Sequence, residues 1–167
     1  MVHSGKSSFL TLFLSQLIFL PSPADVRVPT GLTLHLAEIY LEELEKALSA
    51  SESPTPVPIL ALLSPFISLA AHTQTNTTYK HLEESLFKPL LAGLRPRVSG
   101  IEYPTILSNA CADVPYTDGP MLHSTLRKAM LQKLFAVASA EDTRDTNRRK
   151  MYALYKTAVE DDEDSVG

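Results

Sequence analysis

Apolar residues recur along much of this chain at the three- and four-residue spacing of one helix face. The first clear series predicts an amphipathic helix from Thr33 to Ser49. Its apolar stripe consists of Leu32, Leu36, Ile39, Leu44 and Leu48. Its outward face carries Glu38, Glu42, Glu45 and Lys46. The proline-rich stretch "SASESPTPVP" then ends the helix, because proline has no backbone N–H and biases the preceding residue towards extended conformations.

Two further helical segments are predicted to form an antiparallel pair. The stretch "ILALLSPFISLAAHT", from residue 59, is apolar around most of its circumference, as in a helix that packs on two sides. We expect Pro65 to kink or split this helix. A third helix from Thr78 to Leu91 has Gly93 as its C-cap. Its buried face consists of Leu82, Leu86 and Leu90.

Two more helices follow a long irregular connection that spans residues 95–120. Pro120 suits the first position of the fourth helix. The buried stripe of this helix is Leu122, Leu126, Met130, Leu134 and Val137, and its exposed cations are Arg127, Lys128 and Lys133. The last helix is expected to start near Asp142 or Thr143 and to end at about Val159. It should bury Met151, Leu154, Tyr155 and Ala158.

The composition agrees with an all-α fold of stacked antiparallel helix pairs. The chain has 167 residues, of which 44% are hydrophobic and 20% charged, enough for one domain with its own core. Period-2 alternation is scarce, so no sheet is expected. The closing run "EDDED" lies where the helix dipole disfavours negative charge. We therefore predict that residues 160–167 form a disordered acidic tail.

The net charge of −4 hides a basic segment. Residues 121–159 carry eight Lys and Arg against three Asp and Glu, and five consecutive acids follow from Glu160. Cations repeated on one side of a helix suit phosphates, because each neutralised phosphate releases counterions. The predicted contacts with RNA or an acidic partner are Arg144, Arg148, Arg149, Lys150, Arg127 and Lys128. The alternative is a solvated face balanced by Asp142 and Asp145.

Catalytic and cofactor patterns are weak, and we predict neither an enzyme nor a cofactor. The single Cys111 cannot form an internal disulfide, and the five histidines show no zinc-ligand spacing. Adjacent carboxylates occur in the pairs Glu42-Glu43 and Glu83-Glu84, but neighbours on a helix point about 100° apart. We interpret both pairs as solubilising charges.

The N-terminus allows an alternative. Lys6 followed by an apolar stretch from Phe9 to Leu20 and by "SPA" resembles a secretory signal, and Asn76-Thr77-Thr78 is an acceptor sequence for glycosylation. Together they would describe a secreted small helical glycoprotein with a cleaved signal peptide. The apolar stretch is too short to span a bilayer, which needs about 20 residues, so no membrane contact is expected.

Two stretches resemble the ribosomal RNA-processing protein 1 family. They are "VPTGLTLHLAEIYLEELEKAL" and "LLSPFISLAAHTQTNTTYKHLEESLFKPLL", and the later "EDTRDTNRRKMYALYK" is similar to the segment that closes the domain in fungal members. The resemblance covers approximately Val28 to Glu160. It divides the chain into an atypical apolar segment (residues 1–27), a helical domain (residues 28–159) and the acidic tail (residues 160–167).

The resemblance implies a HEAT-like helical stack and a non-catalytic role. Members of this family belong to the precursor of the large ribosomal subunit in the nucleolus of the nucleus, and they are needed for pre-rRNA processing without cutting RNA. The implied partners are pre-60S assembly factors and ribosomal proteins, with pre-rRNA as an accessory contact. Family members usually carry further helices before the position of Val28. On this ground we expect an N-terminally truncated or misjoined chain, and a further alternative is an incomplete product without a stable fold.

Overall fold

The computed structural model describes residues 30–49, 59–94 and 123–164, and every regular element in these ranges is helical. The elements are α2 (Thr30–Ser49), α3 (Ile59–His72), α4 (Asn76–Leu82), the π-helical turn η1 (Glu83–Phe87), α5 (Lys88–Gly93), α7 (His123–Ser139) and α8 (Asp145–Asp164). The all-α prediction is confirmed. Predictions about the apolar N-terminal segment, the proline-rich connection, Cys111, Pro120 and Leu122 lie outside the described residues.

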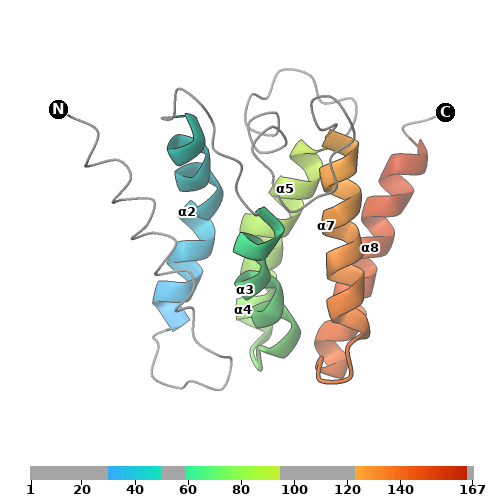
Figure 1. Cartoon of the computed structure of the whole chain (residues 1–167). Helices are drawn as coiled ribbons and strands as arrows, with labels where there is room; N and C mark the ends of the chain where they lie inside the picture. The colour runs from blue at the N-terminus through green and yellow to red at the C-terminus, as the bar shows by residue number, and fades with distance from the viewer. Residues whose placement is uncertain (1–29, 50–58, 95–122, 165–167) are drawn as a thin grey trace.

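Successive helices run in alternate directions (Figure 1). Helix α2 lies against α4 and η1, while α3 packs on α4 and also on α7 and α8. The continuous segment α4–η1–α5 returns antiparallel to α3, and α8 returns antiparallel to α7. The predicted stack of antiparallel pairs is therefore confirmed. The central position of α3 explains why its sequence is apolar on nearly all sides.

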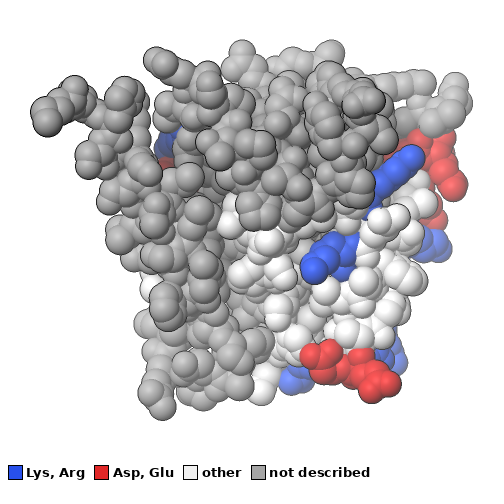
Figure 2. All heavy atoms as spheres, viewed as in Figure 1, with Lys and Arg blue, Asp and Glu red and all other residues white. Residues whose placement is uncertain are grey.

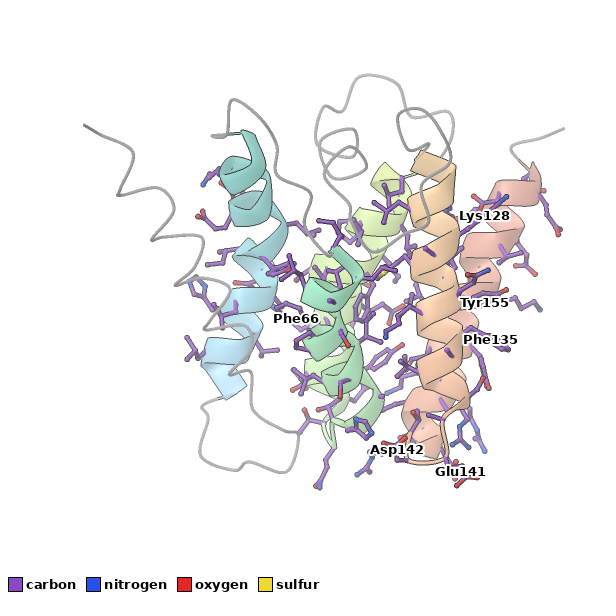
Figure 3. The ribbon with its side chains drawn as sticks, viewed as in Figure 1. Phe66, Lys128, Phe135, Glu141, Asp142 and Tyr155 are labelled. Atoms are coloured by element: carbon purple, nitrogen blue, oxygen red, sulfur yellow. The ribbon has the colours of Figure 1, made fainter. Side chains whose placement is uncertain are left out.

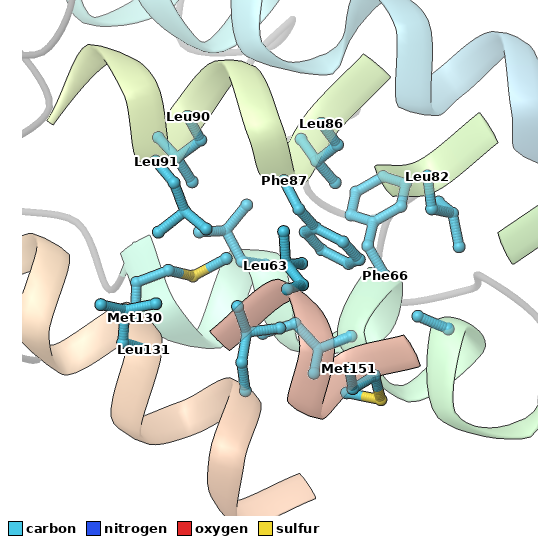
Figure 4. Packing of buried hydrophobic residues seen from close by; sticks show 14 of the residues in the cluster. Leu63, Phe66, Leu82, Leu86, Phe87, Leu90, Leu91, Met130, Leu131 and Met151 are labelled. Carbon is cyan, nitrogen blue, oxygen red and sulfur yellow. The ribbon is translucent and has the colours of Figure 1, made fainter. Parts of the chain in front are cut away.

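One apolar core joins these helices (Figure 4). Leu63 and Phe66 of α3, Leu86 of η1, Met130 of α7 and Met151 of α8 are all buried in it. Burying a side chain of this size stabilises the fold by about 2 kcal/mol. Because isolated helices of these lengths are marginal in water, this shared core rather than helix propensity holds them in place.

The buried face of α2 differs from the predicted stripe. Ala37 and Tyr40 are fully buried, whereas Leu36 and Ile39 are only partly buried and Leu32 is 51% exposed. The ring of Tyr40 meets Phe66 of α3 nearly edge-on, with centroids 4.8 Å apart. This aromatic contact helps to set the rotation of α2, and the predicted apolar stripe was wrong for Leu32. The side chains of Leu44 and Leu48 lie outside the described residues.

Helix α3 is one continuous element across Pro65, so the helix is not split there. Leu63, Phe66 and Ile67, which flank this proline, are at most 1% exposed. Packing on both sides holds the helix together where Pro65 supplies no backbone N–H.

The segment from Asn76 to Gly93 is helical throughout but contains the π-helical turn η1. It begins two residues before the predicted Thr78, with Thr75 as its N-cap, and Leu94 rather than Gly93 occupies the C-cap. The Lys88 N–H donates to the Glu83 carbonyl five residues earlier, directly before Pro89, which has no N–H to donate.

The spacing of the leucines accounts for this π-turn. Leu82, Leu86 and Leu90 are all buried and lie four residues apart. Four residues overshoot a full α-helical turn by about 40°, so a strict four-residue stripe drifts around an ideal helix. The wider turn offsets part of this drift and keeps the three side chains on the core.

Candidate functional site

Arg127, which we predicted to be an exposed RNA contact, is buried and joins three helices. Its side chain is 2% exposed. The Nε atom donates to both carboxylate oxygens of Asp162 in α8, at 2.9 and 3.0 Å. One terminal nitrogen donates to the Ala158 carbonyl at 2.8 Å, and the other donates to the Leu91 carbonyl of α5.

The physical reason for this burial is a shortage of donors at the end of α5. The last four carbonyls of a helix have no partner within the helix, and Leu91 is one of these residues. Arginine supplies several N–H groups in one planar fork and can satisfy a carboxylate and two carbonyls together. The prediction that Arg127 remains exposed was therefore wrong, and its guanidinium is not available to phosphates.

The turn between α7 and α8 is built from polar residues of the basic segment. The Thr143 hydroxyl donates to the Val137 carbonyl at 2.5 Å. Arg148 donates to the carbonyls of Ala138 at 3.0 Å and Ala140 at 2.9 Å, and also to that of Thr143 at 3.1 Å. These bonds satisfy carbonyls left over where α7 ends, so Arg148 closes the turn.

Asn147 fastens the start of α8 to the end of α3. Its side chain is only 3% exposed, and its Nδ2 donates to the carbonyls of Ala71 at 3.2 Å and Thr73 at 2.8 Å. The Arg144 backbone N–H also donates to Ala71, at 3.2 Å. Asn147 lies four residues before the buried Met151, so this amide is part of the inner stripe of α8.

Lys150 connects α8 with α4. Its ammonium group donates to the Asn76 side-chain oxygen at 2.5 Å and lies 4.9 Å from the centre of the Tyr79 ring. A cation over an aromatic face is attracted by the ring quadrupole. Asn76, the first residue of the predicted glycosylation sequence, is therefore engaged in helix packing in this structure.

Three of the six predicted contact residues remain exposed: Lys128, Arg144 and Arg149. None of the three has a side-chain hydrogen bond or ion pair within the part of the chain that the structure describes. Figure 2 shows a largely uncharged surface over α7 and α8 that is interrupted by a group of Lys or Arg atoms, with further charged atoms at its edges. The basic segment thus divides into a structural half and an outward half.

Comparison with known proteins identifies the family. The family described as "Nucleolar protein, Nop52" matches residues 6–164. The chain belongs to the Nop52 family. It is also 28% identical over 127 residues to the ribosomal RNA processing protein 1 homolog of Dictyostelium discoideum. This alignment covers 74% of the chain and 24% of the relative's length. No solved structure matches the chain significantly. The predicted family and its nucleolar character are confirmed.

The range of the Nop52 match bears on the N-terminus. It includes residues 6–27, most of the segment that we placed outside the domain because the resemblance begins at about Val28. Membership of a nucleolar family across this segment favours the nucleolar prediction over the secreted alternative.

The acidic end of this Nop52-family chain is helical up to Asp164, so the prediction of a disordered tail was wrong for Glu160–Asp164. The bond from the buried Arg127 to Asp162 fixes the last turns, and Lys156 Nζ lies 3.6 Å from the Glu160 carboxylate. These two pairs offset part of the unfavourable interaction between acidic residues and the C-terminal end of the helix dipole. The helix begins at Asp145, slightly later than predicted.

The adjacent carboxylates are held by lysines. Lys46 Nζ lies 2.8 Å from Glu42 and Lys88 Nζ donates to Glu84 at 2.6 Å. These hydrogen bonds lower the pKa of both exposed carboxyl groups and make them weaker proton acceptors. Within the described ranges no group of three or more His, Cys, Asp and Glu side chains is placed to hold a metal ion. No helix described in the structure is long and apolar enough to cross a membrane.

Proposed function

We propose that this chain is a non-catalytic ribosome-biogenesis factor that acts as a helical scaffold in pre-rRNA processing within precursors of the large ribosomal subunit. The observation that carries the proposal is the Nop52 match over residues 6–164, together with the name of the Dictyostelium relative. The helical stack supports it, because successive helix pairs offer extended outer surfaces to several neighbours. Its partners are assembly factors and ribosomal proteins.

Contact with pre-rRNA is an accessory to this docking. The exposed cations Lys128, Arg144 and Arg149 are the phosphate contacts that we retain, because Arg127, Arg148 and Lys150 are engaged in packing. A few cations neutralise only a few phosphates, so affinity is low and independent of sequence. Protein contacts must then supply the specificity of the assembly.

Co-sedimentation tests whether the chain belongs to precursors of the large ribosomal subunit. The tagged full chain, expressed in a eukaryotic cell, should migrate with large-subunit precursors on a sucrose gradient and should lose this position when rRNA synthesis is stopped. A chain that is found only in the free soluble fractions contradicts the proposed role.

Charge reversal tests the RNA contacts. The double variant Arg144→Glu/Arg149→Glu should bind a single-stranded RNA more weakly and reduce the salt slope of log K by about 1.4, the value for two lost phosphate contacts. The control Lys46→Glu/Lys88→Glu makes the same change in net charge on α2 and α5, and should retain most of the slope. Equal loss in both variants would assign binding to net charge alone and reject the site.

A further inference from the structure

The outer side of the α7–α8 hairpin carries an open apolar groove. Its volume is about 600 Å³, and its floor includes Leu131 of α7 with Tyr155 and Val159 of α8. Leu131 is 4% exposed and belongs to the main core, so the floor of the groove is continuous with the core. Figure 3 shows Lys128, Tyr155 and Phe135 along this outer side of the hairpin, away from Phe66 in the interior.

A cluster of one exposed and two half-buried aromatic side chains continues the groove at one end. Phe135 is 46% exposed, although it is among the largest apolar residues of α7. Its ring centroid lies 5.4 Å from that of Tyr152 and 5.1 Å from that of Tyr155. The Tyr152 hydroxyl is 3.0 Å from the Ser139 hydroxyl, which fixes this ring. A preformed aromatic cluster of this kind is typical of the centre of a protein interface.

Acidic residues border the opposite end. Asp162 and Glu163 line the groove, and Asp164 completes the last turn of α8. Glu163 and Asp164 are exposed and have no ion-pair partner among the described residues. Negative charge at the C-terminal end of a helix lowers helix stability, so these two carboxylates do not stabilise the fold. Among the described residues that line the groove, Lys128 is the one cation.

We infer that this groove binds a basic amphipathic helix of a partner protein. An amphipathic helix places apolar anchors on one side at helical spacing, which suits a groove between two antiparallel helices. Lysine or arginine residues beside those anchors would meet Glu163 and Asp164, which complement them in charge. The same carboxylates repel phosphates, so the groove is separate from the RNA contacts at Arg144 and Arg149, and Lys128 is the one retained RNA contact that lies on its rim.

The inference rests on the proposed function for the nature of the partner, since proteins of a ribosome precursor are rich in basic segments. It predicts a binding surface that can be measured on the purified chain without ribosomes. Failure of peptide binding would therefore leave the co-sedimentation result untouched, and failure of co-sedimentation would leave the groove in place.

Fluorescence anisotropy with a labelled Leu/Lys model helix of about 14 residues, roughly four turns, tests the groove on the full chain. The Leu/Lys peptide should bind, and a Leu/Glu peptide of the same pattern should not. Phe135→Ser should weaken binding about tenfold, as expected for loss of an aromatic anchor. Phe135→Leu should restore most of it, provided that thermal melts show both variants folded.

Reversing the charge of the two exposed acidic residues tests the predicted preference for a basic peptide more directly than the changes at Phe135. Glu163→Lys/Asp164→Lys should weaken binding of the Leu/Lys peptide and strengthen binding of the Leu/Glu peptide. The control Glu42→Lys/Glu84→Lys changes net charge equally on exposed positions of α2 and η1 and should leave the preference unchanged.

Three outcomes would overturn the inference. The first is equal peptide binding by the wild type, by Phe135→Ser and by the rim variant. The second is displacement of the peptide by oligouridine in a manner that depends on Phe135, which would assign the groove to nucleic acid. The third is a dimer in sedimentation equilibrium that Phe135→Ser dissociates, which would assign the groove to a second copy of the chain.

Discussion

The two ends of α8 are both crowded with charge, but they use it differently. At the N-terminal end, Asn147 and Arg148 direct their donors at backbone carbonyls of α3, α7 and the turn, and Lys150 reaches α4. At the C-terminal end, Asp162 pairs with the buried Arg127, while Glu163 and Asp164 are exposed. Charge density alone therefore does not mark an interface, because what matters is whether backbone groups already engage each side chain.

The largest effect is expected at Arg127, which forms a buried link to the acidic end of α8. Arg127→Met should lower the free energy of unfolding by about 3 kcal/mol, because it removes one partner of a buried ion pair and leaves the Leu91 and Ala158 carbonyls without this donor. Urea denaturation measures the change. The neighbouring Lys128→Met, at an exposed position, should shift stability by less than about 0.5 kcal/mol. Equal effects of the two changes would show that Arg127 is not the link described.

Asn147 tests the opposite end of the helix. Asn147→Ala should lower the free energy of unfolding by about 2 kcal/mol, because the Thr73 carbonyl loses this donor and the Ala71 carbonyl keeps only the Arg144 backbone N–H. The exposed neighbour Thr146→Ala is the matched control for urea denaturation. A loss no larger than that of the control would contradict the role of Asn147 in joining α3 to α8.

Arg148 and Arg149 are adjacent in α8, but we assign a structural role to Arg148 and an RNA contact to Arg149. Arg148→Ala should destabilise the protein by about 1.5 kcal/mol, because three carbonyl contacts of the α7–α8 turn are lost, with little change in RNA affinity. Arg149→Ala should do the reverse, with a stability change below about 0.5 kcal/mol and weaker RNA binding. Thermal melts and RNA titration of both variants measure the contrast. The opposite assignment of effects would exchange the two roles.

Tyr79 gives the smallest expected effect. Burial raises the pKa of this tyrosine, and the nearby Glu83 carboxylate adds to the shift. Because the pKa is higher in the folded state, the stability linked to this group is present below the unfolded value of about 10 and is lost as pH rises above it.

Tyr79→Phe should therefore reduce the fall in Tm above about pH 10, while keeping the ring under Lys150. The Tyr79 hydroxyl is buried without a hydrogen-bond partner in the described structure, so its removal should change stability at neutral pH by less than about 1 kcal/mol. Melts from neutral to alkaline pH compare the variant with the wild type. An unchanged alkaline slope would exclude Tyr79 as a contributor.

Periodicity predicted the helices well because burial follows it. Leu126, Met130, Leu134, Met151, Leu154 and Ala158 all lie in the core as expected. Tyr155 is only half-buried, since it packs with the exposed Phe135 at the outer groove. The groove could not be predicted from the sequence, because the helical spacing of apolar residues does not show which of them the neighbouring helices leave uncovered.

It was harder to predict from the sequence which polar and charged side chains are buried. Asn147 lies on the same stripe as Met151 and Leu154, and this spacing was the available sign of a buried amide. Arg127 directly follows the buried Leu126, but its partners on α5 and α8 are 31 to 36 residues away in the chain. Hydrogen bonds over such separations depend on tertiary arrangement, which local pattern does not contain.

The π-turn at Glu83–Phe87 has a consequence for alignments of this family. It reaches five residues back where an α-helix reaches four, so removal of one residue there would restore ordinary pitch while leaving the flanking helices intact. Relatives are expected to show single-residue gaps at this position, where the helix absorbs a change of length. A gap of the same size inside α7 would turn Leu126 or Leu134 away from the interior, so evolution should avoid it there.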